Sequence, residues 1–263
     1  MDDTENSPLF VTALAKGLGL LSAFQPARPN MNLVEMAEAT RLNKSTIQRS
    51  AYTLEALGYL TKDNHSKRYR LTPKSLEIGT GYLRTSELIE RASPYLHELN
   101  RSTQESCNLL EPYDVEMVYV SRFASHKQIS IHIPLGQRLP MYCTSGGRAF
   151  LSALPESEAA DRIARSSLVQ HTPNTDVDPT SLATKIRQAR YDGFAFSNEE
   201  FYVGDIAVAA PIVNGNSQPL GAINISVPFS RWTLKEVVAE LAPQAVNTAR
   251  TISNAVKGLR PTV

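Results

Sequence analysis

The sequence predicts an α+β protein with two domains: a small helical domain that ends in a β-hairpin, and a larger domain built on an antiparallel sheet. Two short helical patterns joined by a tight turn lie within residues 33–58, and two short strand-like runs follow them. Lysine and arginine are concentrated in this same stretch. Strand-like and helix-like segments then alternate through the remaining chain, which is typical of an α+β domain.

Length and composition are those of a globular protein. The chain has 263 residues, of which 42% are hydrophobic and 20% are charged, and this is enough for two domains. No apolar run approaches the ~20 residues of a membrane-spanning helix. The acidic, polar N-terminus does not fit a secretory signal. The two cysteines, Cys107 and Cys143, are not in a metal-type pair. We therefore expect a cytoplasmic protein with free thiols and no membrane partner.

The charge is distributed unevenly, although the formal net charge is only +1. Residues 40–74 contain eight lysines and arginines but two acidic residues, whereas residues 77–263 contain 17 basic and 19 acidic residues. A basic patch within one small region indicates a nucleic-acid-binding domain attached to a body with another role.

The first helix is expected at residues 8–24, with Pro8 in its first turn. Its apolar content exceeds what a solvated helix needs, so it is expected to pack beneath the next two helices, and a second subunit is considered as a further partner. In the second of those helices, Asn43 suits the N-cap and Gly58 suits the end. One face of that helix is apolar: Ile47, Ala51, Leu54 and Leu57.

The opposite face of the same helix carries side chains suited to DNA. Glutamine and arginine can pair with base edges, whereas serine, threonine and lysine suit phosphates. An ordinary solvated face is the alternative interpretation. The runs 59–61 and 68–71 flank a polar, basic tip, and helix-turn-helix plus such a hairpin forms a winged helix. The candidate DNA contacts are Lys44, Ser45, Thr46, Gln48, Arg49, Lys67 and Arg68.

The larger domain follows a predicted linker helix at residues 73–88 and a helix that runs to about Thr103. Its expected strands are residues 107–110, 115–123, 129–133, 193–198, 206–213 and 220–227. Its expected helices are about 145–155, 156–166, 180–191 and 233–257, the last of which opens with a capping box. Five or six antiparallel strands surrounded by helices are typical of sensor domains.

Polar side chains mark three places in the larger domain. Thr144-Ser145-Gly146-Gly147 precedes a helix, where hydroxyls and free N–H groups suit a small anion, although an N-cap and turn explain the same residues. Asn224 and Ser226 share one face of an apolar strand, so either the protein or a ligand must supply their partners. Ser197 and Asn198 follow a strand and can bind a ligand. Glu199 and Glu200 are interpreted as a solvated edge or an interface contact.

Motifs for catalysis and cofactor binding are missing from the sequence. Ser145 lacks the G-x-S-x-G pattern, and a cysteine in an apolar strand, such as Cys143, is typical of packing. The histidines show no metal-ligand spacing, and there is no phosphate or dinucleotide fingerprint. We expect no enzyme activity, no metal and no cofactor. Two alternatives are retained: an enzyme with Cys143 or Ser145 as nucleophile, and a non-sensing interaction protein, each fused to a DNA-binding domain.

The chain resembles the IclR (isocitrate lyase regulator) family of bacterial transcription factors over nearly its full length. The matching stretches are LVEMAEATRLNKSTIQRSAYTLEALGYL, RYRLTPKSLEIG, IPLGQRLPMYCTSGGRAFLSALP and GFAFSNEEFYVGDIAVAAPIVNGNSQPLGAINISVP. The resemblance implies a winged helix-turn-helix domain (1–72), a linker helix (73–88) and a GAF/profilin-like domain for effector binding and oligomerisation (89–263). It also implies homodimers or homotetramers on palindromic promoter DNA.

By position, the resemblance places the effector pocket at Ser145, Gly146, Gly147, Ser197, Ala207, Asn224 and Ser226. The chain departs from common members of the family at three points. It has Arg148 where lysine is common, lacks the acidic residue common at Ser197, and has Asn224 where serine is frequent. These departures argue against a very small 2-oxo acid. The CTSGGRA segment is similar to members that control aromatic-acid degradation, which implies an aromatic carboxylate or a related catabolic metabolite as effector.

Overall fold

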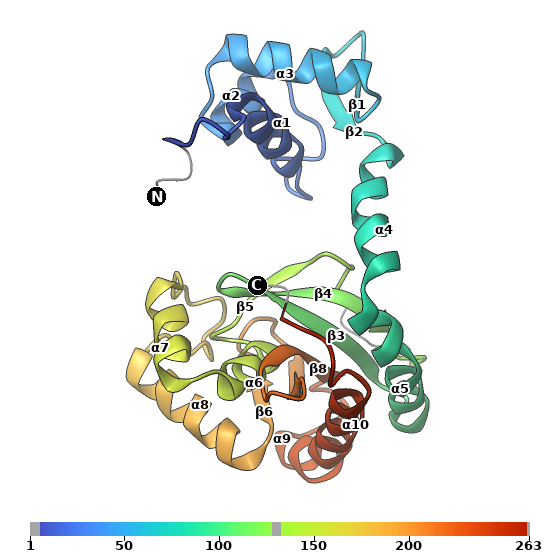
Figure 1. The fold of residues 1–263 in the computed structure, drawn as a ribbon, viewed down its shortest axis with the longest axis vertical. Helices are drawn as coiled ribbons and strands as arrows, with labels where there is room; N and C mark the ends of the chain where they lie inside the picture. Colours follow the sequence, from blue (N-terminus) through green and yellow to red (C-terminus); the bar gives the residue numbers. More distant parts are fainter. Residues whose placement is uncertain (1–5, 128–132, 262–263) are drawn as a thin grey trace. The chain divides into compact units, whose positions relative to one another are not determined.

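The computed structural model describes residues 6–127 and 133–261. The chain divides into two compact units, Met1–Tyr82 and Leu83–Val263 (Figure 1). The stretch expected as one linker helix contains a short 3-10 helix, η2 (Pro73–Ser75), and then α4 (Leu76–Thr85), while α5 (Glu87–Thr103) begins before the expected linker ends. No helix among the described residues is both long enough and apolar enough to cross a bilayer.

The N-terminal unit contains the expected helix-turn-helix and hairpin. Its elements are α1 (Thr12–Ser22), α2 (Leu33–Thr40), α3 (Lys44–Ala56), β1 (Leu60–Lys62) and β2 (Tyr69–Leu71). Asn43 caps α3, as expected, because its side-chain oxygen accepts a hydrogen bond from the Thr46 N–H at 2.8 Å. Gly58 has a φ of +82°, so the chain turns there into the antiparallel hairpin of β1 and β2.

The core of this unit is small and comes from α1, α2, α3, β1, β2 and the loop before α2. Its buried residues are Leu20, Met31, Met36, Ile47, Ala51, Leu54, Leu60 and Tyr69. The expected apolar face of α3 is correct except at its end: Leu57 is 53% exposed, because α3 stops at Ala56 and the chain then turns away. The first helix starts at Thr12 rather than Pro8, and Leu20 is its one buried residue.

The C-terminal unit is built on an antiparallel sheet, which confirms the predicted fold class. The strands are β3 (Ser106–Tyr113), β4 (Glu116–Phe123), β5 (Arg138–Pro140), β6 (Ala195–Asn198), β7 (Asp205–Val213) and β8 (Pro219–Pro228). Their order is β5-β4-β3-β8-β7-β6, and every neighbouring pair is antiparallel. The short strand β5 was not predicted. The strand predicted at 129–133 lies, except for Ile133, outside the described residues.

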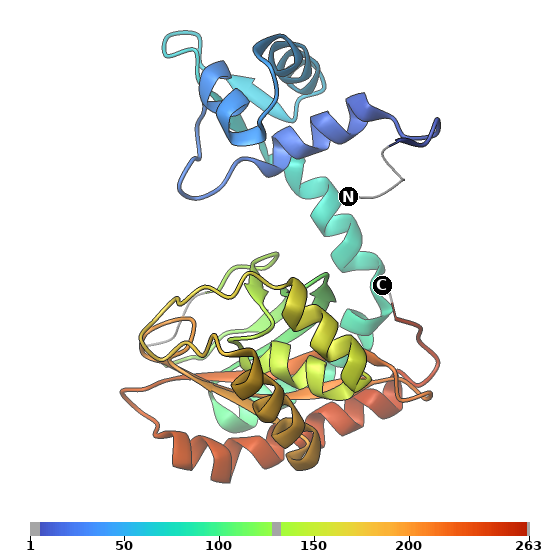
Figure 2. The same cartoon turned by 90° about the vertical axis from the view of Figure 1, so that its left-hand side faces the viewer.

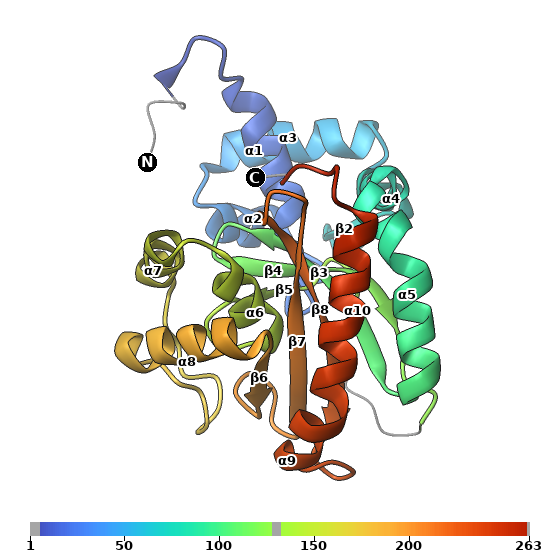
Figure 3. The same cartoon turned by 60° about the horizontal axis from the view of Figure 1, so that its bottom comes forward.

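Helices cover both faces of the sheet (Figures 2 and 3). One face packs against α5, α9 (Leu234–Glu236), the π-helical segment η3 (Val237–Leu241) and α10 (Ala242–Ala255). The other face packs against α6 (Ser145–Ala153), α7 (Glu156–Arg165) and α8 (Pro179–Asp192). The final helix was predicted to be continuous, but it changes geometry at η3, just before Pro243, which has no N–H to donate.

The two faces of the central strand β8 differ in chemistry. Ile223, Ile225 and Val227 belong to the apolar cluster beneath α5 and α10. Asn224 and Ser226 point to the other side because side chains alternate along a strand. The register pairs Asn224 with Asn108 and Ser226 with Ser106 on β3. Polar side chains are thereby brought together on the sheet face that also carries α6.

Candidate DNA-binding surface and effector site

The candidate DNA contacts on α3 are mostly exposed. Lys44, Ser45, Gln48 and Arg49 are exposed, and Thr46 is half-buried. Arg49 and Thr46 also lie along a largely apolar groove of about 590 Å³ between α1 and α3. The position of these residues on the helix after a tight turn is that of a recognition helix in a helix-turn-helix protein.

The two candidate residues on the hairpin differ. Lys67 is exposed at the tip, where its φ is +56°. Arg68 is only half-exposed, because its Nη2 donates to both carboxylate oxygens of Glu35, at 2.7 and 2.8 Å, and to the carbonyl of Asn30 at 3.0 Å. The hydrogen bond from Asn32 N–H and the one from Arg68 lower the pKa of Glu35. Arg68 therefore already has a partner within the protein, whereas Arg70, which was not predicted, is exposed on β2.

A small cavity in the C-terminal unit lies between the sheet, the start of α6 and the segment before β7. Its lining residues are Tyr119, Ile133, Leu139, Thr144, Ser145, Ser197, Phe201, Tyr202, Asp205, Ala207 and Asn224. The cavity measures about 10 Å³, close to the space that one water molecule needs. Four of the seven predicted effector residues line it: Ser145, Ser197, Ala207 and Asn224.

The other three predicted residues lie close to the cavity without lining it. A Cβ at Gly147 would lie 2.2 Å from Met141 Cα, so this position requires glycine for packing. A Cβ at Gly146 would meet the Leu110 side chain at 3.1 Å. Thr144 Oγ1 accepts from Gly147 N–H at 3.3 Å, and this supports the N-cap interpretation of the segment.

The polar pair on β8 obtains its partners from the protein. Asn108 Nδ2 donates to Asn224 Oδ1 at 2.8 Å, and Arg122 Nη1 lies 3.5 Å from Asn108 Oδ1. Ser226 Oγ donates to Asp205 Oδ1 at 2.7 Å. The prediction that these strand residues need partners is confirmed, and the structure supplies them from other strands of the same sheet.

Among the cavity residues that the sequence prediction missed, Asp205 is the one with an acidic side chain. It is partly buried at the start of β7 and lines the cavity. Burial raises its pKa to about 6, although the hydrogen bond from Ser226 and the charge of Arg122 both act to lower it. A carboxyl group with a strongly shifted pKa in a cavity is a candidate functional group. At the sequence level it was simply a polar residue before an apolar run, and no periodicity distinguished it.

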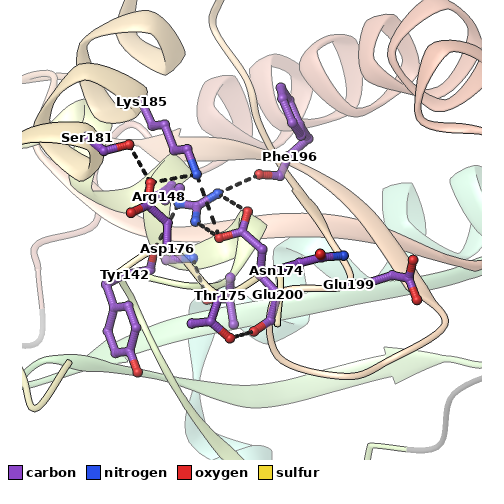
Figure 4. A network of polar contacts seen from close by, with 12 residues as sticks. Tyr142, Arg148, Asn174, Thr175, Asp176, Ser181, Lys185, Phe196, Glu199 and Glu200 are labelled. Atoms are coloured by element: carbon purple, nitrogen blue, oxygen red, sulfur yellow. Dashed lines mark hydrogen bonds and ion pairs between the residues drawn. The ribbon is translucent and has the colours of Figure 1, made fainter. Parts of the chain in front are cut away.

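Glu200 directly precedes the cavity residues Phe201 and Tyr202, and it belongs to a buried ion pair that Figure 4 shows. Arg148 on α6 forms a two-pronged contact with the carboxylate of Glu200. Its Nε also donates to the Tyr142 carbonyl at 2.8 Å, and its Nη1 donates to the Phe196 carbonyl at 3.0 Å. The interpretation of Glu200 as a solvated edge is therefore wrong, because Arg148 comes from another element and provides its partner.

A second ion pair lies beside the first (Figure 4). Lys185 Nζ on α8 lies 2.8 Å from Asp176 Oδ2 and 3.9 Å from Glu200 Oε2. Burial acts to raise the pKa of Asp176, but hydrogen bonds from Lys185 and Ser181 prevail and lower it to about 2. Lys185 thus lies between two carboxylates, that of Asp176 before α8 and that of Glu200 after β6.

The cysteines are poorly suited to nucleophilic chemistry. Burial raises the pKa of Cys107 and that of Cys143 to about 12. Both thiols are free and buried. Because the thiolate is the nucleophilic form, a thiol with such a pKa is unreactive near neutral pH. This argues against the alternative in which Cys143 acts as a catalytic nucleophile.

Comparison with known proteins gives matches along most of the chain. Residues 80–254 match the family model of the bacterial transcriptional regulator IclR C-terminal domain, and residues 13–64 match that of the IclR helix-turn-helix domain. The Pca regulon regulatory protein of Pseudomonas putida is 31% identical, with 95% of this chain and 86% of that protein covered.

Solved structures agree with the family models. A transcriptional regulator from Rhodococcus sp. RHA1 is 31% identical, with a TM-score of 0.80 and coverage of 94% of this chain and 98% of that chain. The inducer-binding domain of the PobR transcription factor from Acinetobacter, solved as a double mutant in complex with 3-hydroxybenzoic acid, is 26% identical. Its TM-score is 0.60, and the match covers 65% of this chain and all of that domain.

Proposed function

Because the chain belongs to the IclR family of bacterial transcriptional regulators, we propose that it binds a palindromic promoter site and releases or rearranges on it when an aromatic carboxylate enters the cavity of the C-terminal unit. The protein is a ligand-responsive regulator, and we place its action in the cytoplasm. The observation that carries the proposal is the polar cavity at Ser145, Ser197 and Asn224, in a chain that also carries an exposed recognition helix.

Two copies of the N-terminal unit suit a palindromic site. Two-fold DNA symmetry is read by two recognition helices that are spaced one or more helical turns apart. The exposed apolar residues Leu14 and Leu18 on α1, together with the groove between α1 and α3, offer a surface for a second subunit. We propose a homodimer or homotetramer on this ground. The proposed base and phosphate contacts are Lys44, Ser45, Thr46, Gln48 and Arg49 on α3 and Lys67 and Arg68 on the hairpin, with Arg68 restrained by Glu35.

The closed state of the cavity links ligand binding to a change of shape. A cavity of about 150 Å³ accommodates a benzene ring, which is far more than the space present here. Residues that line the cavity must therefore move apart when an aromatic acid binds. Such a ligand shifts the equilibrium between arrangements by as much as its affinity for them differs. The aromatic class is supported by the hydroxybenzoic acid complex of the PobR domain.

A thermal-shift screen over aromatic and aliphatic carboxylates tests the effector half of the proposal. A ligand present at 100 times its Kd stabilises a protein by about 2.7 kcal/mol, which raises the melting temperature measurably. Acids that raise it are then added to a mobility-shift titration on the promoter DNA and should change the DNA affinity. A screen in which no carboxylate raises the melting temperature contradicts the sensor function and favours a non-sensing interaction protein.

A further inference from the structure

The carboxylate of Asp205 lines the cavity and has room for further hydrogen-bond donors. Within the described residues, Ser226 is the one side chain that donates a hydrogen bond to it, at 2.7 Å. An ionised carboxylate has room for several donors on its two oxygens. A further donor brought by a ligand would form a charge-assisted hydrogen bond, which is stronger than one between neutral groups.

The charged and titratable groups around Asp205 do not replace such a donor. The titratable groups whose charges interact with Asp205 are Tyr119 and Arg122 on β4 and Tyr202 in the segment before β7. Arg122 acts on it through its charge, and burial nevertheless raises the pKa of Asp205 to about 6. Asn224 Oδ1 accepts a hydrogen bond from Asn108 Nδ2 at 2.8 Å, and Asn224 Nδ2 lies 3.5 Å from Tyr119 Oη. Asp205 is therefore the strongest acceptor that lines the cavity.

A negative charge in the cavity also restricts how an aromatic acid can lie in it. Two carboxylates in contact repel one another, so the carboxylate of the effector must lie away from Asp205. Thr144 and Ser145 line the same cavity at the start of α6, where a helix N-terminus favours an anion. The part of the ligand next to Asp205 must then be neutral, and it is best bound if it donates a hydrogen bond.

We propose that Asp205 accepts a hydrogen bond from a hydroxyl group of the effector and thereby selects hydroxylated aromatic acids over aromatic acids without a hydroxyl group. This inference rests on the proposed function of the cavity as an effector site. Sites that hydrogen-bond a substrate hydroxyl discriminate strongly against the analogue that lacks it, because the buried polar group is left unpaired. A charge-assisted bond of ordinary strength corresponds to about 10-fold to 100-fold in affinity.

Titration calorimetry on the full-length protein tests the proposal without any variant. Benzoate is compared with 3-hydroxybenzoate, 4-hydroxybenzoate and 3,4-dihydroxybenzoate at pH 7. At least one hydroxylated acid should bind about 10-fold or more tightly than benzoate. Equal affinities for benzoate and all three hydroxylated acids would overturn the role of Asp205 while leaving the aromatic effector class intact. Binding of none of the four would overturn both.

Two variants test whether Asp205 causes the preference for hydroxylated acids. Asp205→Asn keeps the shape and one oxygen acceptor but removes the charge, so the preference for the hydroxylated acid should fall several-fold while benzoate binds no worse. Asp192→Asn, an exposed carboxylate at the end of α8, is the matched control and should keep the wild-type preference. A folded Asp205→Asn protein with an unchanged preference contradicts the proposal.

The pH dependence separates hydrogen bonding from a structural role. The hydroxyl donates more strongly to the ionised carboxyl, and the pKa of Asp205 is about 6. The preference for the hydroxylated acid should therefore rise from pH 5 to pH 7 in the wild-type protein and stay flat in Asp205→Asn. If Asp205→Asn merely loosened the cavity, the variant would bind all four acids more weakly and its preference for the hydroxylated acid would still rise with pH. That result would overturn the inference.

Discussion

Two arginine–glutamate pairs, one in each unit, have the same chemistry and very different surroundings. Arg68 and Glu35 form a pair at 2.7 Å whose side chains are 40% and 37% exposed. The side chains of Arg148 and Glu200 are only 3% and 6% exposed. Arg148 also donates to two backbone carbonyls, which satisfies a guanidinium that water cannot reach.

The two units use their charged side chains differently: the N-terminal unit exposes them, and the C-terminal unit buries this pair. On α3 and the hairpin, cationic side chains remain at the surface, where they can meet the phosphates of a DNA duplex. In the C-terminal unit, Arg148 and Glu200 bind each other and hold the segment that carries Phe201 and Tyr202 against the cavity. A change of an exposed charge on α3 or the hairpin should therefore alter DNA binding, whereas a change within the buried Arg148–Glu200 pair should alter stability and cavity shape.

The largest expected effect is a loss of folding stability in Glu200→Ala. This substitution leaves the Arg148 guanidinium buried without its carboxylate, and breaking a buried pair in this way costs about 3–5 kcal/mol. Urea unfolding followed by fluorescence measures it, because Trp232 is the sole tryptophan and lies in the C-terminal unit. Glu35→Ala serves as the exposed counterpart and should leave the Trp232 transition unchanged. If Glu200→Ala and Glu35→Ala show the same urea transition, the buried pair is no more important for stability than the exposed one.

The next effect is a pH dependence of stability due to Asp205. Its pKa is raised to about 6 in the folded protein, from 3.8 for an ordinary aspartate, so the folded state binds the proton more tightly. This tighter proton binding adds up to about 3 kcal/mol to the free energy of unfolding at a pH below 3.8, the ordinary pKa. The contribution is lost as the pH rises through 6. Asp205→Asn should therefore gain stability relative to wild type between pH 4 and pH 7. Parallel unfolding curves for both proteins across this range would contradict the shift.

Arg49→Ala should change DNA binding and leave folding unaffected. If Arg49 contacts a base, the substitution costs about 1–3 kcal/mol of specific binding and relaxes the preference at that position. Mobility-shift titrations on the promoter site and on a variant site measure both quantities. Arg165→Ala, an exposed arginine of the C-terminal unit, is the control. Unchanged affinity and sequence preference would remove Arg49 from the proposed contacts.

The smallest effect is expected from Glu35→Gln. Glutamine can still accept the hydrogen bond from Asn32 N–H and complete the capping box, but it no longer neutralises Arg68. DNA binding should tighten slightly, and the slope of log affinity against log salt should steepen by up to about one. Glu38→Gln, an exposed glutamate on the same helix, should have less influence on this slope. Identical slopes would mean that Arg68 does not reach the DNA.

Local patterns were sufficient for most of the fold. The three-to-four-residue periodicity of α3, the Asn43 cap and the polar tip of the hairpin identified the winged helix-turn-helix, since each feature is decided by near neighbours in the chain. Alternation along β8 placed Asn224 and Ser226 on one face for the same reason. The end of α3 was the exception, because Leu57 continues the apolar pattern in sequence while the helix has already stopped.

Contacts between distant residues were decided by the tertiary structure. Periodicity assigns a side chain to a face, but it does not say which residue from another element will meet it. Glu200 was interpreted as part of a solvated edge or an interface contact, yet Arg148, 52 positions away in the sequence, forms a buried ion pair with it. Asp205 similarly acquired its place in the cavity only when β7 paired with β8 and brought Ser226 to it. The burial of a charge depends on its partner, and that partner is supplied by the fold.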